Sequence, residues 1–579
     1  MFLPVVFMDG IIGKFFYQFG VTMSAAVMLS LLEAVTITPM RAAALLGTAP
    51  KISRFEHWLE VVSSRLACVY QGGLQRILRV PWLVVGITLA IFAGSLLLVP
   101  LVKQEFVPAQ DQNFIFVSAQ TPPGTSLETT RQKALALETI ISAQPEVEGF
   151  LVSIGGGGGA SEVNQMSFPV TLKDRKYRAK NHQQVMEDLR ARFKEVKGVR
   201  VTMRDISARN LTSGRLNPLS FIMTGPDLGI LEKKSAELIK RLTDEGFAQE
   251  MDTDFRSGLP ELLIRPNREK MAEHGVSIES VASTLNVAVA GTRQSRYTAE
   301  AKRYDVRIKL PQEYVSSAKD IEKIFVRNQF GNLVSLSRLV DISESSSYQS
   351  ITRINRQRAI GIFGNTAGGY AQGQVVARAQ AIAREILPED YHLALEGASA
   401  GLTETFKSLG GALVMGIMVA YMILAIQFNS FVHPVTVLMS LPFSFTGVFL
   451  ILWMTGISLN LFSFIGIIVL MGIAKKNAIL LVEFTNQVRR SSPALSVQQA
   501  LVHACPIRLR PIVMTSVATV AAALPLVIGN SIGQETRTPM GLTIIGGTVV
   551  STFFSLFVVP CVYLLLSRLE WRAKKKDLF

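Results

Sequence analysis

Two adjacent lysines and an asparagine, Lys475, Lys476 and Asn477, lie in an apolar stretch that runs from about Leu459 to Phe484. The stretch is long enough to cross a bilayer, and a charge at that depth costs on the order of 2.5–3.5 kcal/mol on insertion scales. Ionisable side chains inside a span indicate ion or proton transfer. We expect Lys476 to be the deeper lysine, because Asn477 and further apolar residues follow it. Its ammonium could pair with a carboxylate that gains and loses a proton.

A structural alternative needs no chemistry: one lysine extends to the interface, and the other caps the packing between helices. The functional interpretation requires an acid at similar depth. Glu33 is the only acidic residue well inside an apolar run of this chain. Arg508 and Thr515, at the start of a later run, could add a charge and a hydroxyl to the same network. Thr515 alone is weak support, because a threonine in a helix commonly bonds its own backbone.

The elements that must position these residues are apolar runs of about 20 residues, the length that spans hydrocarbon. The chain has 579 residues, 49% of them hydrophobic. Seven runs are expected to span a membrane, at 17–38, 82–102, 407–427, 433–455, 459–484, 511–529 and 540–566. The predicted fold class is therefore a polytopic α-helical membrane protein with a large α+β insert between the second and third spans.

The helical part divides into five stretches. Residues 1–48 hold the end of one span and a complete helix, 49–80 an amphipathic cytoplasmic connector, 81–102 a helix, 401–566 five helices, and 567–579 a basic cytoplasmic tail. Met1 opens directly into an apolar segment with no charged region ahead of it, which is typical of neither a signal peptide nor a full span. We therefore expect a chain that begins inside a larger protein.

The charge balance indicates a membrane surface. The net charge is +15, and much of the excess lies in short flanks beside the spans, as in the final "RLEWRAKKKDLF". Such flanks mark the cytoplasmic side and also suit anionic lipid. No module combines basic and stacking residues, so nucleic acid is not an expected partner. The 103–400 segment then lies on the opposite face, which in a bacterium is the periplasm, and none of the three cysteines falls in it.

Within the 103–400 segment the periodicity alternates between strand and helix. Residues 103–215 show the order βαββαβ, a split unit of the ferredoxin type. A second such subdomain is expected from 216–257 and 346–400, interrupted by an inserted domain at 258–345. Ligands often bind at the interface between such units.

Five consecutive glycines, Gly155, Gly156, Gly157, Gly158 and Gly159, interrupt the first subdomain. Each costs about 0.8–1 kcal/mol in a helix, so the run holds no regular element. A phosphate cradle would need a following helix and a Lys-Ser/Thr pair, which are missing from the sequence here. We expect a mobile loop that gates a site or lies on the surface; a plain linker is the alternative.

Several stretches together resemble the resistance–nodulation–division superfamily of exporters, in its hydrophobe and amphiphile (multidrug) branch. They are residues 35–46 and the stretches "FVPAQDQNFIFVSAQTPPGTSLETT", "AIQFNSFVHPVTVLMSLPFSFTG", "GIIVLMGIAKKNAILLVEF" and "RLRPIVMTS". Their order and spacing match the C-terminal portion of the family pattern.

The resemblance implies a proton-driven, trimeric pump of the bacterial inner membrane. It would capture amphiphilic compounds from the periplasm or outer leaflet and pass them through an adaptor protein to an outer-membrane channel. The two subdomains would be porter subdomains, and 258–345 part of a docking domain. The relay lysine falls on Lys476, the relay threonine on Thr515 and the nearby arginine on Arg508. The glycine run takes the place of the family's switch loop, with Phe150 and Phe168 on either side.

The chain also departs from the family pattern. The paired relay aspartates belong to a span upstream of this sequence, and the N-terminal porter half is missing from it. We therefore expect this polypeptide to work only with a missing N-terminal half, from the same or a separate chain. In the docking region, Asn267 precedes Arg268 where the family has an Asp-Arg pair.

Two other functions remain open. Export of heavy-metal ions would favour clustered methionines for soft ions, but those of the 103–400 segment are scattered. A membrane anchor that presents a periplasmic binding module would retain binding when Lys476 is neutralised. Enzyme chemistry is not expected, because the six histidines are dispersed and the sequence shows no Ser/His/Asp or metal-ligand spacing. No cofactor or metal site is expected.

Overall fold

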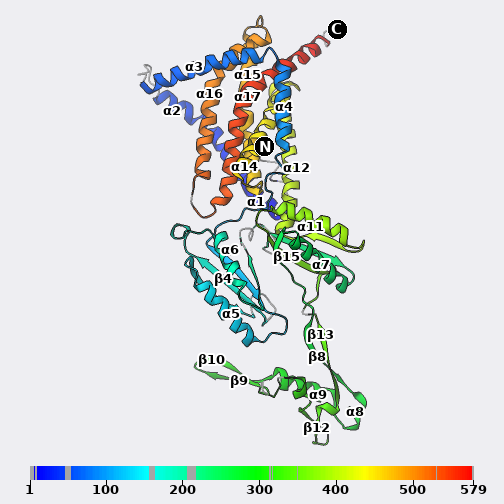
Figure 1. Cartoon of the computed structure of the whole chain (residues 1–579). Helices are drawn as coiled ribbons and strands as arrows, with labels where there is room; N and C mark the ends of the chain where they lie inside the picture. The colour runs from blue at the N-terminus through cyan, green and yellow to red at the C-terminus, as the bar shows by residue number, and fades with distance from the viewer. Residues whose placement is uncertain are drawn as a thin grey trace. The chain divides into compact units, whose positions relative to one another are not determined.

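The computed structural model describes residues 6, 10–45, 54–155, 163–204, 206, 211, 217–311, 314–315, 317–348, 350–529 and 531–576. The chain forms two compact parts. The main part holds Met1–Gln120, Leu127–Asp254 and Arg353–Phe579, and the smaller part holds Thr121–Ser126 and Phe255–Thr352. Figure 1 shows the elements of both.

Long apolar helices make up the first region of the main part. They are α1 (Gly10–Val35), α2 (Ile37–Leu45), α3 (Arg54–Ile77), α4 (Pro81–Leu96), α12 (Gly397–Phe428), α13 (His433–Leu438), α14 (Ser440–Thr455), α15 (Leu461–Ser491), α16 (Val497–Val527) and α17 (Gln534–Lys576). Among the described residues, six helices or joined helices are long and apolar enough to cross a membrane. A seventh is reached if α3 and α4, bent by 100°, count as one span.

The second expected span, 82–102, is shorter in the structure than the sequence predicts. Helix α4 has 16 residues and ends at Leu96, and the chain continues in turns to Val102. Pro81 begins this helix, because a proline is tolerated at the first helical position and cannot continue α3. The bend between α3 and α4 therefore lies at a position where the sequence forbids one continuous helix.

Helix α17 is the central packing element of the helical region, and it contacts α14, α15 and α16 along its length (Figure 1). Glycines allow the close approach: a Cβ on Gly447 of α14 would lie 2.4 Å from the carbonyl oxygen of Gly546 on α17. A Cβ on Gly466 of α15 would lie 2.9 Å from the carbonyl oxygen of Met540. Small residues at helix interfaces are typical of membrane proteins, where close packing drives association.

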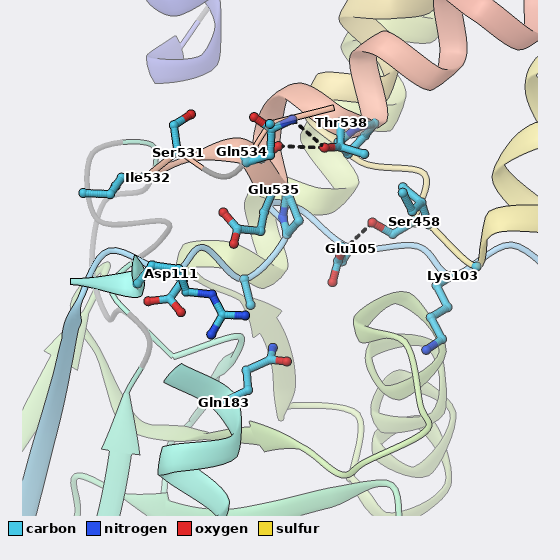
Figure 2. Close-up of a pocket in the computed structure, with 17 residues that line it drawn as sticks. Lys103, Glu105, Asp111, Gln183, Ser458, Ser531, Ile532, Gln534, Glu535 and Thr538 are labelled. Atoms are coloured by element: carbon cyan, nitrogen blue, oxygen red, sulfur yellow. Dashed lines mark hydrogen bonds between the residues drawn. The ribbon is translucent and has the colours of Figure 1, made fainter. Parts of the chain in front are cut away.

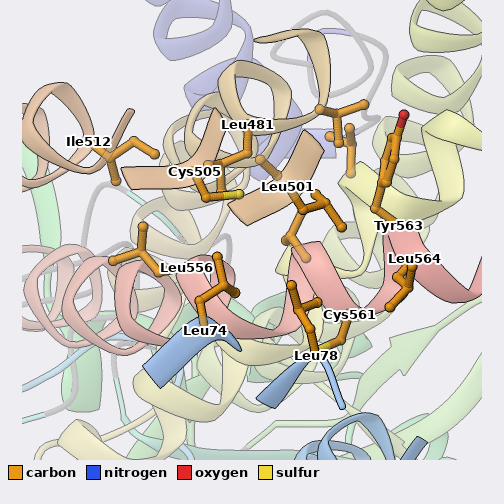
Figure 3. Packing of buried hydrophobic residues seen from close by; sticks show 14 of the residues in the cluster. Leu74, Leu78, Leu481, Leu501, Cys505, Ile512, Leu556, Cys561, Tyr563 and Leu564 are labelled. Atoms are coloured by element: carbon orange, nitrogen blue, oxygen red, sulfur yellow. The ribbon is translucent and has the colours of Figure 1, made fainter. Parts of the chain in front are cut away.

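A cluster of buried residues joins α3 to the ends of α15, α16 and α17 (Figure 3). Leu74 of α3 and Leu78 just after it pack there with Leu481, Cys505 and other apolar side chains. The Tyr70 hydroxyl donates a hydrogen bond of 2.6 Å to the carbonyl oxygen of Leu556. Helix α3 is thus amphipathic, because one face packs on the bundle while other residues stay exposed.

The first α/β unit of the main part is one antiparallel sheet with two helices. Its elements are β1 (Phe114–Gln120), α5 (Leu127–Ser142), β2 (Val147–Phe150), β3 (Ser153–Ile154), β4 (Gln165–Leu172), α6 (His182–Phe193) and β5 (Arg200–Arg204). The strand order is β2-β4-β1-β5, with β3 paired to β4. Alternate residues of β1 are buried, as a half-covered strand requires.

The second α/β unit repeats this strand order. Its elements are β6 (Leu219–Gly225), α7 (Leu228–Asp244), β7 (Ala248–Thr253), β14 (Thr352–Ile354), β15 (Gln357–Thr366), α11 (Gln372–Ile386) and β16 (His392–Leu395). The sheet runs β14-β15-β6-β16, and β7 also pairs with β15. The order β7-β15-β6-β16 within it corresponds to β2-β4-β1-β5 of the first unit. Both units thus share the order of a split βαββαβ fold. The second is interrupted between β7 and β14, close to the interruption predicted at 258–345.

The smaller part is built on a long antiparallel ribbon of β8 (Leu259–Pro266) and β13 (Val340–Ser347). Its other elements are α8 (Arg268–Glu273), α9 (Ile278–Leu285), β9 (Thr292–Ala299), β10 (Lys302–Ile308), α10 (Ala318–Ile321), β11 (Phe325–Arg327) and β12 (Leu333–Ser335). Its own core includes Met271, Val326, Leu336 and Leu339. Asn267 caps α8 by accepting a hydrogen bond from the backbone of Lys270.

Candidate functional site

The two lysines of α15 lie on different faces of the helix. Lys475 is 4% exposed, whereas Lys476 is exposed. Lys475 is therefore the more enclosed of the two lysines, and the expectation that Lys476 lies deeper in the membrane stays a prediction. Consecutive residues of an α-helix are about 100° apart, so Lys475 shares the buried face of Met471 and Ala478, and Lys476 does not.

Neither ammonium has an acidic partner among the described residues. No ion pair involves Lys475 or Lys476, and Glu33 on α1, the expected intramembrane acid, is exposed and unpaired within the same part of the chain. The structure thus does not bring Glu33 to the lysines. A charge of this kind is retained in a span only where a partner or water compensates it.

Asn477 is buried and belongs to a partly buried polar cluster that joins three helices. Its amide nitrogen lies 3.4 Å from the Ser516 hydroxyl of α16 and 3.4 Å from the Thr552 hydroxyl of α17. The two hydroxyls are 2.8 Å apart, and Thr552 also donates to the carbonyl oxygen of Thr548 at 2.7 Å. We call Asn477, Ser516 and Thr552 the polar triad.

Sequence reasoning selected Asn477 but missed Ser516 and Thr552. The one signal in the sequence for Ser516 is that it follows Thr515 directly. That signal is weak, because a hydroxyl in a span usually bonds its own helix. Thr515 does so: its hydroxyl donates to the carbonyl oxygen of Ile512 at 3.1 Å. Ser516 is the residue that reaches across to a neighbouring helix.

Arg508 lies apart from the triad. Its guanidinium carbon is 4.3 Å from the centre of the Phe484 ring, a cation–π contact between α16 and α15. Its Nε is buried and without a hydrogen-bond partner among the residues that the structure describes. Thr515 and Arg508 therefore do not form one network with Asn477 here, contrary to the expectation from sequence.

A polar cavity of about 460 Å³ lies next to the first α/β unit, where α14 and α16 end and α15 and α17 begin (Figure 2). Three carboxylates line it: Glu105, Asp111 and Glu535. The Ser458 hydroxyl donates to Glu105 and accepts a hydrogen bond of 2.8 Å from Asn460. Asn460 in turn caps α15, because its side-chain oxygen accepts from the backbone of the first turn.

Asp111 at this cavity is held as a carboxylate. Burial by itself would raise its pKa, but hydrogen bonds from His182 and Arg178 outweigh that effect and place the pKa well below the usual value of an aspartate. The Arg178 side chain is 0% exposed and forms an ion pair with it. The backbone N–H of His182 donates to the other carboxylate oxygen at 3.1 Å.

A short extended segment, Lys103–Phe106, ties the start of α15 to the second α/β unit. The backbone N–H of Leu459 donates to the carbonyl oxygen of Lys103 at 2.7 Å, and that of Leu461 donates to Phe106 at 3.2 Å. On its other side, Phe106 N–H donates to Gln372 Oε1 at 2.8 Å. Gln372 begins α11, and its amide also donates to the carbonyl oxygen of Pro218 at 2.7 Å. We call Lys103–Phe106 the coupling segment.

A second cavity, of about 570 Å³, lies between the two α/β units of the main part. The first unit contributes Met186 and Arg190 of α6, and the second contributes Gln249 and Asn365. Phe106 of the coupling segment also lines it. Such a concave space between two similar units is a typical ligand site.

The residues expected to line a substrate cleft beside the glycine run are mostly core residues. Phe168 is 0% exposed inside the first α/β unit, and Phe150 packs partly buried against the same core. This corrects the assignment of Phe168 to a cleft wall, because strand alternation turns Phe168 inward, whereas the assignment of Phe150 stays a prediction. Gly155 has a φ of +73° and donates its N–H to Gln165. Gly156, Gly157, Gly158 and Gly159 lie outside the described residues.

The comparison with known proteins covers nearly the whole chain. A family model described as the AcrB/AcrD/AcrF family matches residues 1–567. Two solved structures share the fold; they are titled crystal form II and crystal form I of "a heavy metal efflux pump". Their TM-scores are 0.86 and 0.83, at 21% and 22% identity. Both matches cover 98% of this chain and 57% of the other, so the chain spans little more than half the length of these structures.

Proposed function

Because this chain belongs to the AcrB/AcrD/AcrF family, we propose that it is the C-terminal portion of a proton-driven RND efflux permease of the bacterial inner membrane. It exports amphiphilic drugs or other xenobiotics and exchanges them for protons. It works as a homotrimer with a periplasmic adaptor and an outer-membrane channel, and only when the N-terminal half of the permease is present.

The observation that carries the proposal is the exposed ammonium of Lys476 on a membrane-spanning helix. No described residue supplies it with a carboxylate. An unpaired charge on an apolar helix is strongly unfavourable, so we assign its partner to an acid outside this chain. When that acid takes up a proton, its attraction for Lys476 falls and the ammonium is free to shift toward another partner.

The other relay candidates keep distinct roles in this proposal. Asn477, through the triad, fixes the rotation of α15 about its axis. Arg508 and Thr515 on α16 provide a charge and a hydroxyl that the moving proton or water can use. Glu33 remains a candidate acid for a state in which α1 and α15 approach each other.

The coupling segment provides a physical route from the proton site to the substrate site. A movement of α15 pulls on Lys103–Phe106 through the bonds at Leu459 and Leu461, and this segment is bonded to Gln372. Coupling over such a distance needs packed or hydrogen-bonded elements with two arrangements. The cavity between the α/β units, which Phe106 lines, would then open and close with protonation. The glycine run is proposed to shape that cleft as a loop.

The experiment is drug accumulation in cells that carry the complete permease. Lys476→Ala should return accumulation of an amphiphilic dye to the level of pump-free cells, while Lys240→Ala, an exposed lysine of α7, serves as the control and leaves export unchanged. Normal export by the Lys476→Ala permease would refute the proton-relay role.

Export of heavy-metal ions is the second candidate, because both matching structures are titled heavy metal efflux pumps. The described residues contain no group of three or more His, Cys, Asp or Glu side chains placed to hold a metal ion. Growth in graded copper, silver and zinc salts, beside growth in amphiphilic drugs, separates the two substrate classes. Protection against metals with none against drugs would reverse our assignment.

A further inference from the structure

The carboxylate of Glu250 makes an unusual connection between the two α/β units. Glu250 lies in β7 of the second unit, and its Oε1 pairs with Arg190 Nε of α6 in the first unit. Its Oε2 accepts hydrogen bonds from the backbone N–H of Met203, 3.1 Å away in the first unit, and from Asn365, 2.8 Å away in its own unit. Three donors therefore converge on one partly buried carboxylate, which strengthens each bond.

The backbone at Glu250 is bent to make this connection. Its φ is +53°, a left-handed conformation that L-residues rarely adopt. The pairing of β7 with β15 slips at the same place, between Phe363 and Asn365. A bulge of this kind redirects a side chain away from its normal alternation. A Cβ on Gly364, opposite the bulge, would lie 2.3 Å from the sulfur and 3.0 Å from the Cα of Met251, so the two strands approach closely here.

Other groups repeat the connection along the same boundary. Asn365 donates a hydrogen bond of 2.8 Å to the carbonyl oxygen of Met203 as well as to Glu250. Arg200 of β5 forms an ion pair with Asp252 of β7. The boundary is therefore polar and charged, in contrast to the apolar cores of the two units.

The cavity between the units begins beside these contacts. Arg190 and Asn365, which both bind Glu250, line it together with Met186, one helical turn before Arg190. At another point the cavity is lined by Gln372 and Phe106, which hydrogen-bond each other. Around this cavity, the second unit is thus attached to the coupling segment through the Gln372 side chain and to the first unit through the Glu250 side chain.

We propose that Glu250 is a positioning residue that latches the two α/β units together and sets how often the cavity between them opens. Its contacts to the first unit are one ion pair and one hydrogen bond, which can break without unfolding either unit. The attachment at Gln372 then acts as the hinge. The proposal rests on the proposed transport function for its use, but the latch itself is a property of these contacts.

The test measures opening directly. In the complete permease, with any cysteines of the N-terminal half replaced by serine, Cys68→Ser and Met186→Cys leave one accessible reporter thiol in this chain, since Cys505 and Cys561 are buried and Met186 is 8% exposed. The rate of labelling by a membrane-impermeant maleimide then follows the open population. Glu250→Gly removes the carboxylate, and glycine accepts the left-handed backbone without strain. We expect labelling about tenfold faster, the ratio that loss of a charge-assisted contact of ordinary strength gives.

A matched control separates a latch from general loosening. Glu245→Gln breaks a two-point ion pair with Arg378 inside the second unit, with bonds of 2.6 and 2.7 Å. It should leave the labelling rate unchanged. In a double-mutant cycle, Arg190→Ala and Glu250→Gly together should label no faster than the faster single variant, because both remove the same contact.

The proposal is overturned if Glu250→Gly labels at the parental rate, if Glu245→Gln accelerates labelling equally, or if the two latch variants are additive. Labelling needs no substrate or proton gradient, so its result is independent of transport. Lys476→Ala should block export, and in that background Glu250→Gly should still accelerate labelling by the same factor. Failure of the latch with Lys476→Ala still blocking export leaves the proposed function standing, and the converse result leaves the latch standing.

Discussion

The hydroxyls of Ser516 on α16 and Thr552 on α17 lie 2.8 Å apart in the interior of the helical region, with the Asn477 amide of α15 within 3.4 Å of both. Three helices that contribute most of the apolar packing thus also share one polar contact. Hydrogen bonds between membrane helices are worth roughly 0.6 kcal/mol on average and up to about 1.7. The contact is therefore a modest source of stability and a precise constraint on the rotation of α15.

We predict that Thr552→Val lowers the stability of the permease in detergent by about 1 kcal/mol, because it removes the hydroxyl's bonds to Asn477 and Ser516 as well as its bond to Thr548 without changing the side-chain volume much. The midpoint of thermal unfolding checks this. Thr515→Val is the control: its hydroxyl bonds its own helix, so its unfolding midpoint should stay closer to that of the parent. Equal shifts in the two variants would contradict the triad.

Lys475→Met should stabilise the permease and retain export. Lys475 is buried without an acidic partner among the described residues, and an uncompensated charge in a span is costly, on the order of 2.5–3.5 kcal/mol. A methionine of similar length fills the same space. Differential scanning fluorimetry and a dye-export assay on the same preparation check both parts. A Lys475→Met permease that is stable and inactive would instead place Lys475 in the relay.

The different burial of Lys475 and Lys476 separates what the sequence predicts about α15 from what it does not. The apolar run, its length and the charged residues within it were predicted correctly, because composition alone sets them. The burial of Lys475 rather than Lys476 was not predicted, because it depends on which face of α15 meets α14 and α17. A period of 3.6 residues cannot identify that face when nearly every position is apolar.

The same contrast holds in the α/β units. Their strand order and the interruption of the second unit follow from alternation and turn residues, which are local signals. Phe168 was misjudged because it was assigned by its position after the glycine run, whereas its neighbours in space are core residues of the sheet. The ion pair between Glu250 and Arg190 joins residues 60 apart in sequence. It also depends on a β-bulge that the local sequence pattern does not predict.

Gln372→Leu should weaken the coupling between α15 and the second α/β unit. The change removes the acceptor for Phe106 N–H and the donor to Pro218, and leaves two backbone groups without their partners. We expect a loss of about 1–3 kcal/mol in stability and a dye-export rate that falls while the affinity for the dye is retained. Fluorescence-polarisation binding beside transport measures this split. Export at the parental rate would contradict a role for the coupling segment.

Asp111→Asn should change how stability depends on pH. The pKa of Asp111 is lowered in the folded protein from the ordinary value of 3.8. Its contribution to stability is therefore fully present above about pH 4 and is lost as the pH falls toward the folded value. Removing the charge leaves Arg178 buried and unpaired, at a cost of about 3–5 kcal/mol.

Denaturant unfolding of the first α/β unit within the permease, followed at pH 7 and near pH 3, tests this prediction. The difference between parent and Asp111→Asn should be large at pH 7 and smaller near pH 3. Glu128→Gln, which breaks an exposed pair with Arg131 on α5, should show little difference at either pH. A difference for Asp111→Asn that is the same at both pH values would contradict the assigned ion pair.

The most direct test of the account is proton flux through the complete permease in sealed vesicles, with a pH-sensitive dye inside and an amphiphilic substrate added. The account predicts that substrate drives proton movement in the parent and in Lys475→Met, and that Lys476→Ala abolishes it while still binding substrate. Substrate-driven proton movement at the parental rate in Lys476→Ala would contradict the account.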